Sequence, residues 1–141
     1  MSTIKVDTYL TRGGVSEIAI DKLKGASSAS SISVVGEGGT TTTNLQQGLA
    51  KTWYLASNSA SLTDSFNVSS GSDGGTGNYT YNYSNAFSNA NYSVSGVCGE
   101  GSIFIMFNSS RATGSSNNKI GNTSGSVTDA QNTGQINGDL A

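Results

Sequence analysis

The side chains that could do covalent chemistry are few in this sequence. It contains no histidine, so the usual general base of a serine or cysteine catalytic site is absent. Cys98 is the sole cysteine, and its neighbours, Gly-Val before it and Gly-Glu after it, include no cation that would lower the pKa of the thiol. We therefore interpret Cys98 as a small buried residue, and a disulfide within the chain is excluded.

Paired carboxylates are a second kind of catalytic site. Glycoside hydrolysis uses two of them, and Asp64 and Asp73 are the nearest candidates. Asp64 opens a predicted strand and Asp73 stands in a turn, so structural roles explain both residues better. We expect that the chain is not an enzyme. We also expect no metal and no cofactor, because zinc ligands are missing and the Gly-rich stretches lack the spacing of nucleotide-binding loops.

Three tyrosines form the one group with binding potential. Tyr79, Tyr81 and Tyr83 alternate with polar residues in NYTYNY, so they share one face of a strand. One interpretation makes them candidate contacts for a neutral glycan, on which tyrosine can stack while asparagine donates hydrogen bonds. The other makes them the inward face of the strand, with hydroxyls that reach the rim of a core. The sequence favours the inward face but leaves both interpretations open.

Composition predicts a small core and therefore association with other chains. Ser, Thr, Asn and Gly number 25, 15, 14 and 19, which is 73 of the 141 residues, and the chain has one Trp and four Phe. A domain of this size with so few large side chains is marginally stable unless something is added. Oligomerisation is the common addition when disulfides and zinc are excluded. We expect a homotrimer or another small closed oligomer.

Charge and hydropathy argue against several partners. Seven Lys and Arg stand against nine Asp and Glu, with no basic cluster, so we expect no binding to nucleic acid. No apolar run is long enough to cross a membrane, so we expect no membrane partner. The first ten residues lack the basic start and the unbroken apolar stretch of a signal peptide, which predicts synthesis in a cytoplasm.

Alternating apolar residues predict strands along most of the chain. The expected strands lie at 3–10, 16–24, 31–35, around 66–68, at 79–83, at 92–98 and at 102–108. Residues 44–55 fit a short helix best, and Asp73-Gly74-Gly75 is a strong hairpin signal. Residues 111–141 are interpreted as a polar tail with two weak strands, near Val127 and Ile136.

The run SIFIMFN at 102–108 is apolar on both faces. Ile105 and Phe107 would lie on one face, and Phe104 and Met106 on the other. This pattern is typical of a strand that is buried on both sides. We therefore predict that it is the central strand of the domain.

Together these patterns predict an all-β protein. We expect a small antiparallel β-sandwich or jelly-roll-like domain over residues 57–141, preceded by an extended docking segment over residues 1–56. The absence of proline agrees with paired strands. Unpaired strands in the docking segment invite pairing with another chain. Ile4, Val6 and Leu10 share one face there and are candidate docking contacts.

Five phrases of the sequence carry a resemblance to a known class of proteins. MSTIKVDTYLTRGG, GLAKTW, DSFNVSS, GTGNYTYNY and ANYSVSG occur in this order within residues 1–96. They resemble fibre-like and decoration virion proteins of tailed phages that infect marine bacteria and cyanobacteria. The resemblance implies a homotrimeric structural protein on the virion surface that brings no catalytic residues.

The length of the chain narrows what this resemblance implies. Many such fibre proteins have a stalk between the anchor and the C-terminal module, and this chain has little room for one. A compact capsid decoration, cement or short-fibre protein is therefore expected, with the major capsid protein or another virion protein as its partner. The alternative is a tail-fibre-type module that recognises a glycan on the host surface.

Overall fold

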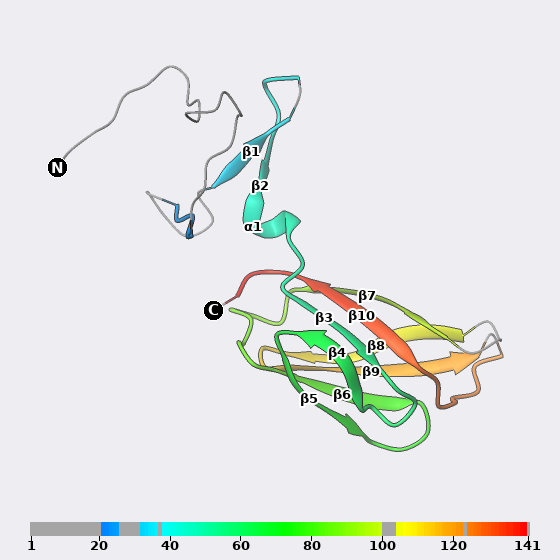
Figure 1. The fold of residues 1–141 in the computed structure, drawn as a ribbon. Coiled ribbons are helices and arrows are strands. Elements are labelled where there is room, and N and C mark those ends of the chain that lie inside the picture. Colours follow the sequence, from blue (N-terminus) through cyan, green and yellow to red (C-terminus); the bar gives the residue numbers. More distant parts are fainter. Residues whose placement is uncertain (1–20, 26–31, 37, 100–103, 123, 141) are drawn as a thin grey trace, which may run out of the picture.

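The computed structural model describes residues 21–25, 32–36, 38–99, 104–122 and 124–140. Within these residues the chain forms ten strands and one four-residue helix. Eight of the strands build two four-stranded antiparallel sheets that pack as a sandwich (Figure 1). The predicted all-β sandwich is therefore confirmed.

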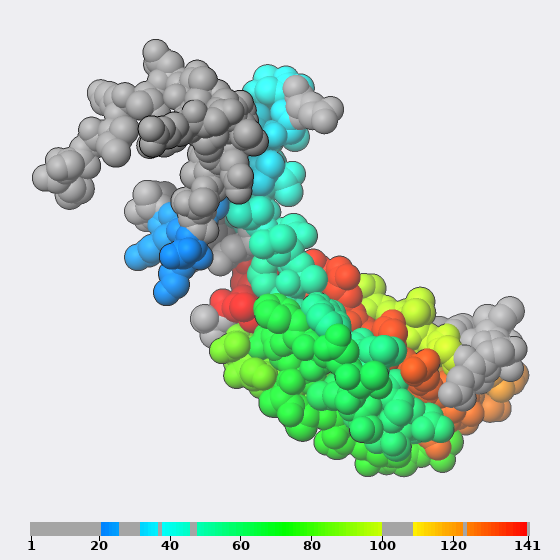
Figure 2. All heavy atoms as spheres, in the orientation of Figure 1, coloured from blue at the N-terminus to red at the C-terminus, as the bar shows by residue number. Residues whose placement is uncertain are grey.

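A short hairpin precedes the sandwich. β1 (Ser33–Val35) pairs with β2 (Thr42–Asn44) and is followed by α1 (Leu45–Gly48). Figures 1 and 2 show this hairpin projecting from the sandwich, to which α1 connects it. Every residue of β1 is exposed, so the hairpin has no apolar face packed on the sandwich.

The hairpin region tests several predictions. The strand predicted at 31–35 is confirmed over Ser33–Val35, whereas the helix predicted at 44–55 is only the single turn of α1. The described end of the strand predicted at 16–24, residues 21–24, is not a strand. The strand predicted at 3–10, with Ile4, Val6 and Leu10, lies outside the described residues.

The two sheets of the sandwich draw on strands that are far apart in the sequence. The first sheet has the order β4 (Leu62–Phe66), β3 (Thr52–Ala56), β10 (Asn132–Asn137) and β7 (Ser93–Cys98). The second has the order β5 (Val68–Asp73), β6 (Asn78–Tyr83), β9 (Ser115–Asn122) and β8 (Phe104–Ala112).

The boundary predicted after residue 56 is wrong, because β3 lies before it and is an inner strand of the first sheet. The sandwich begins with Lys51, whose backbone N–H donates to the carbonyl oxygen of Ile136 at 2.8 Å. Residues 111–141 are not a polar tail either, since β9 and β10 are inner strands of the two sheets, although the strand predicted near Ile136 is confirmed as β10. Their buried Ser and Asn side chains gave these strands a polar composition.

A sharp corner at Asn67 carries the chain from the first sheet to the second. Its backbone φ is 59°, a left-handed conformation that Asn adopts more readily than most residues. Its side-chain Nδ2 donates to the Lys51 carbonyl at 3.1 Å, and its Oδ1 accepts from the Asn85 backbone at 2.7 Å. The prediction of one continuous strand around 66–68 is therefore wrong, because β4 ends at Phe66 and β5 begins at Val68.

The predicted position of the apolar run at 102–108 is also wrong. β8 is an edge strand, which pairs with β9 and with no other described strand. Apolar residues on both faces do not distinguish an edge from a centre, because that position depends on backbone partners. Residues 102–103 lie outside the described part of the chain.

Buried tyrosines fill much of the space between the sheets. Tyr54 of β3 stacks on Tyr81 of β6, with ring centroids 3.9 Å apart. The Tyr81 hydroxyl donates to Asn132 Oδ1 at 2.8 Å, and Asn118 Nδ2 donates to the Tyr54 hydroxyl at 2.9 Å. A second cluster, next to Ile136, contains Tyr83, Phe87 and Tyr92.

Gly134 of β10 makes room for the Tyr54 ring. A Cβ atom at this position would overlap with ring atoms and the hydroxyl of Tyr54, which the stack on Tyr81 holds in place. Close packing of this kind leaves no space for an added methyl group.

We predict that Gly134→Ala destabilises the sandwich by about 1–3 kcal/mol, because the Tyr54 ring must shift from its stack. The free energy of unfolding in urea measures this loss. Gly114→Ala is the matched control, since a Cβ there meets no atom within 4 Å. It should change the free energy of unfolding by less than about 1 kcal/mol. Equal effects of the two substitutions would contradict the packing argument.

The buried tyrosines also predict an alkaline limit to stability. Burial raises the pKa of Tyr81 to about 12 and raises the pKa of Tyr54 and Tyr83 as well. Unfolded tyrosine ionises near pH 10, so the fold, which favours the neutral hydroxyl, is fully stabilised below about pH 10. This stabilisation is lost as the pH rises from about 10 towards the Tyr81 pKa of about 12.

Circular dichroism measures the unfolding and tyrosine absorbance measures the ionisation that this prediction connects. We expect the melting temperature to fall steeply above about pH 10 and most tyrosine ionisation to accompany unfolding. Ionisation of all tyrosines at their ordinary pKa in a chain that stays folded would contradict the prediction.

Candidate functional site

The outer face of the first sheet carries two exposed aromatic residues. Thr52, Tyr54 and Ala56 point into the sandwich, so strand alternation turns Trp53 and Leu55 outwards. Trp53 is 39% exposed and pairs in register with Phe66 of β4, which is 53% exposed. Two large aromatic side chains thus lie side by side in solvent.

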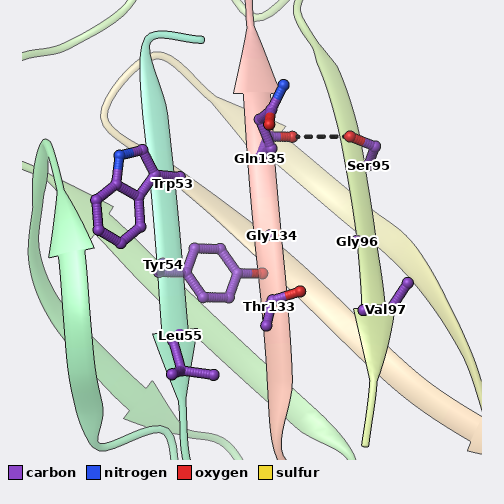
Figure 3. Close-up of a pocket in the computed structure, with 9 residues that line it drawn as sticks. All are labelled: Trp53, Tyr54, Leu55, Ser95, Gly96, Val97, Thr133, Gly134 and Gln135. Atoms are coloured by element: carbon purple, nitrogen blue, oxygen red, sulfur yellow. Dashed lines mark hydrogen bonds between the residues drawn. The ribbon is translucent and has the colours of Figure 1, made fainter.

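A shallow trough of about 520 Å³ lies in this face. It is lined by Trp53, Tyr54, Leu55, Ser95, Gly96, Val97, Thr133, Gly134 and Gln135, from β3, β10 and β7 (Figure 3). Figure 3 shows Trp53 on one side, next to β3, and Val97 on the opposite side, on β7. The volume lies within the range of small-molecule sites.

Hydrogen bonds hold the polar part of the trough. Ser95 Oγ donates to the backbone carbonyl of Gln135 at 3.4 Å, which Figure 3 marks with a dashed line. The Gln135 side-chain Nε2 donates to Asn137 Oδ1 at 3.3 Å. This bond orients the Gln135 amide and leaves its carbonyl oxygen as an acceptor at the surface.

The trough contains no carboxylate and no ammonium or guanidinium group. Asp64 lies outside it, opposite Leu55 in the register of β3 and β4, and its Oδ1 accepts from the Ser65 backbone at 2.8 Å. The Ser95 and Thr133 hydroxyls therefore have no neighbour among the lining residues that could act as a general acid or base. The trough can hold a neutral ligand through an aromatic ring and uncharged polar groups.

The candidate glycan contacts predicted from the sequence are not at the surface. Tyr79 and Tyr81 are 0% exposed and Tyr83 is 8% exposed, so these side chains cannot contact a glycan, and that interpretation is wrong. The inward interpretation is correct, and a hydroxyl reaches the rim, as expected, where its partners are exposed residues. The Tyr79 hydroxyl, for example, lies 2.9 Å from the Asn58 carbonyl oxygen and 3.0 Å from Asp129 Oδ1.

The other residues considered for chemistry have structural positions. Cys98 is half-buried against the cluster around Tyr54, and burial raises the pKa of its thiol. Asp73 Oδ1 accepts from the Gly75 backbone at 2.8 Å, so this carboxylate holds the β5–β6 turn. Asp64 belongs to the other sheet, and the two carboxylates do not form a pair.

The part of the chain that the structure describes has neither a metal-binding cluster nor a helix that could cross a membrane. It holds no group of three or more His, Cys, Asp or Glu residues that could bind a metal ion. No described helix has the length and apolar character needed to cross a membrane. The predicted shell contacts Ile4, Val6 and Leu10 lie outside this part of the chain.

Sequence reasoning missed Trp53 because KTWYLA was assigned to a helix. The alternation of Thr52, Tyr54 and Ala56 with Trp53 and Leu55 would have shown an aromatic residue on the outer face of a strand. The chain matches no protein-family model, and no curated protein or solved structure is significantly similar to it.

Proposed function

We propose that this chain is a structural protein on the outer surface of a phage virion, as a capsid decoration, cement or short-fibre protein. The arm, defined as the residues before Lys51, would attach the molecule, and the sandwich would project from the particle. The five phrases that resemble virion proteins support the location. The exposed β1–β2 hairpin supports attachment through the arm.

The exposure of the hairpin is the observation that carries this proposal. All three residues of β1 and the first two of β2 are exposed, including Val34 and Val35. An isolated two-stranded hairpin is marginally stable in water, and its edges carry unpaired backbone donors and acceptors. A partner strand would satisfy these groups, as in known cases of strand addition. The major capsid protein or another virion protein would supply that strand.

The sandwich, in contrast, has its own core. Two clusters of buried side chains lie between its sheets, and no described residue of the arm belongs to either of them. Attachment and folding are thus assigned to separate parts of the chain. This separation suits a protein that adds to the surface of an assembled particle, which it stabilises because it binds the assembled form.

Self-association is part of the proposal. The composition argument for a homotrimer still applies, because much of the core consists of tyrosine and small residues and the one cysteine is unpaired. Light scattering of the full-length chain should give the mass of a trimer or another small closed oligomer. A stable folded monomer at micromolar concentration would contradict this expectation.

The second candidate function is a receptor-binding module of the tail-fibre type. The trough beside Trp53 favours it, because an exposed aromatic residue next to uncharged polar groups suits a glycan. The position of the protein on the particle discriminates between the two functions. Many copies spread over the shell indicate a decoration protein, and a few copies at the tail or the vertices indicate a fibre.

Removing the arm provides the main test. We predict that a chain beginning at Leu49 keeps the circular dichroism spectrum and the melting temperature of the sandwich. It should no longer co-sediment with particles that lack the protein, because the hairpin is gone. A cut at the boundary predicted from the sequence, after residue 56, is unsuitable, since it removes β3 and with it Tyr54.

A full-length variant tests the role of the hairpin without removing any residue. Val35→Asp places a charge on the exposed hairpin and should weaken co-sedimentation. Val127→Asp changes a comparably exposed valine outside the hairpin and should leave co-sedimentation unchanged. If the shortened chain binds particles as well as the full-length chain does, attachment lies in the sandwich and the proposed orientation is reversed.

A further inference from the structure

We propose that the trough in the outer face of the first sheet binds a neutral saccharide. In this proposal the Trp53 indole stacks on a sugar ring, and Gln135 and Thr133 form hydrogen bonds with sugar hydroxyls. The site goes beyond the structural role proposed above and does not depend on the arm. It replaces the buried tyrosines as the place where a glycan could bind.

The position of Trp53 is fixed before any ligand arrives. β3 is hydrogen-bonded on both sides, to β4 and to β10, so the backbone that carries the indole is held in register. Phe66 lies opposite Trp53 on β4 and extends the aromatic surface. The C–H face of a pyranose is apolar and packs on such a ring, which removes apolar area from water on both partners.

Uncharged polar groups lie on β10, the strand that neighbours β3 in the trough. Gln135 stands opposite Trp53 in the register of β3 and β10, and Thr133 stands opposite Leu55. The Thr133 hydroxyl can donate and accept, and the Gln135 carbonyl oxygen can accept while its Nε2 bonds to Asn137. Sugar hydroxyls also donate and accept, so this pair of side chains matches their chemistry.

The absence of charged residues from the trough favours a neutral ligand. None of its nine lining residues is Asp, Glu, Lys or Arg. A phosphate or a carboxylate that entered it would lose hydration without gaining a countercharge, which is unfavourable. Nucleotides and acidic sugars are therefore poor ligands, whereas a neutral saccharide carries no such cost.

A second copy of the chain is the competing occupant of this face. Trp53, Phe66 and Val97 are exposed, and aromatic residues are enriched in the cores of protein interfaces. Stable interfaces, however, are packed as closely as protein interiors. A flat sheet face laid over this trough would leave part of it unfilled, whereas a saccharide can enter it.

The single tryptophan of the chain makes the test direct. Because Trp53 is the only tryptophan, fluorescence excited at a wavelength that tyrosine does not absorb reports on the trough alone. The protein is titrated with neutral oligosaccharides of glucose, galactose, mannose and N-acetylglucosamine. At least one of them should give a saturable change in fluorescence and protect the indole from acrylamide. Glucuronic acid oligosaccharides should give none.

Substitutions in the trough locate the binding. Gln135→Ala should weaken binding about tenfold, which corresponds to the loss of one hydrogen bond. Thr133→Val removes only the hydroxyl and should weaken binding to a similar extent. Val127→Ala, outside the trough, is the matched control and should leave the affinity unchanged. Melting temperatures within a few degrees of the parent chain show that the variants fold.

Three outcomes would overturn the proposal. The first is that no oligosaccharide of the panel changes the fluorescence at millimolar concentration. The second is that Gln135→Ala and Thr133→Val bind as tightly as the Val127→Ala control. The third is an indole that acrylamide reaches only after dilution has dissociated the oligomer, which would make this face a subunit interface. None of these outcomes involves particle binding, so the role of the arm is tested separately.

Discussion

The need to satisfy buried tyrosine hydroxyls is the constraint on which the rest of the sandwich depends. The stacked rings of Tyr54 and Tyr81 lie between the sheets, and an unbonded hydroxyl there would cost the fold stability. Asn118 of β9 and Asn132 of β10 supply the partners, and both are buried. β9 and β10, which supply these partners, therefore have to be polar in sequence.

The same constraint determines the outer surface. Tyr54 occupies the inner face of β3, so the alternation of the strand places Trp53 outside, and a slip of one residue would exchange the two. Gly134 lets β10 run beside the Tyr54 ring and also lines the trough. The core and the candidate site thus lie on opposite faces of the same strands. A change of strand register that alters one face therefore also alters the other.

Local patterns predicted part of this fold. Alternation identified the tyrosine strand and its inward face, and Asp-Gly-Gly identified the β5–β6 turn, because both depend on neighbours in the sequence. The corner at Asn67 and the edge position of β8 were not predicted. The corner is held by Lys51 and Asn85, and β8 is an edge because, among the described strands, only β9 pairs with it. Contacts between distant segments leave no period in the sequence.

The candidate site was hidden for a related reason. Its lining residues come from β3, β10 and β7, and each strand contributes three ordinary residues that form no motif. β10 was interpreted as part of a tail, although its buried asparagine and glycine are what a core of stacked tyrosines requires. In a chain so rich in Ser, Asn and Gly, polarity is a poor guide to exposure, since hydroxyl and amide groups bond to one another inside the sandwich. The exposed aromatic residues Trp53 and Phe66 are more informative than polarity about the location of a binding site. A chain with one Trp and four Phe has few large apolar side chains to leave in water.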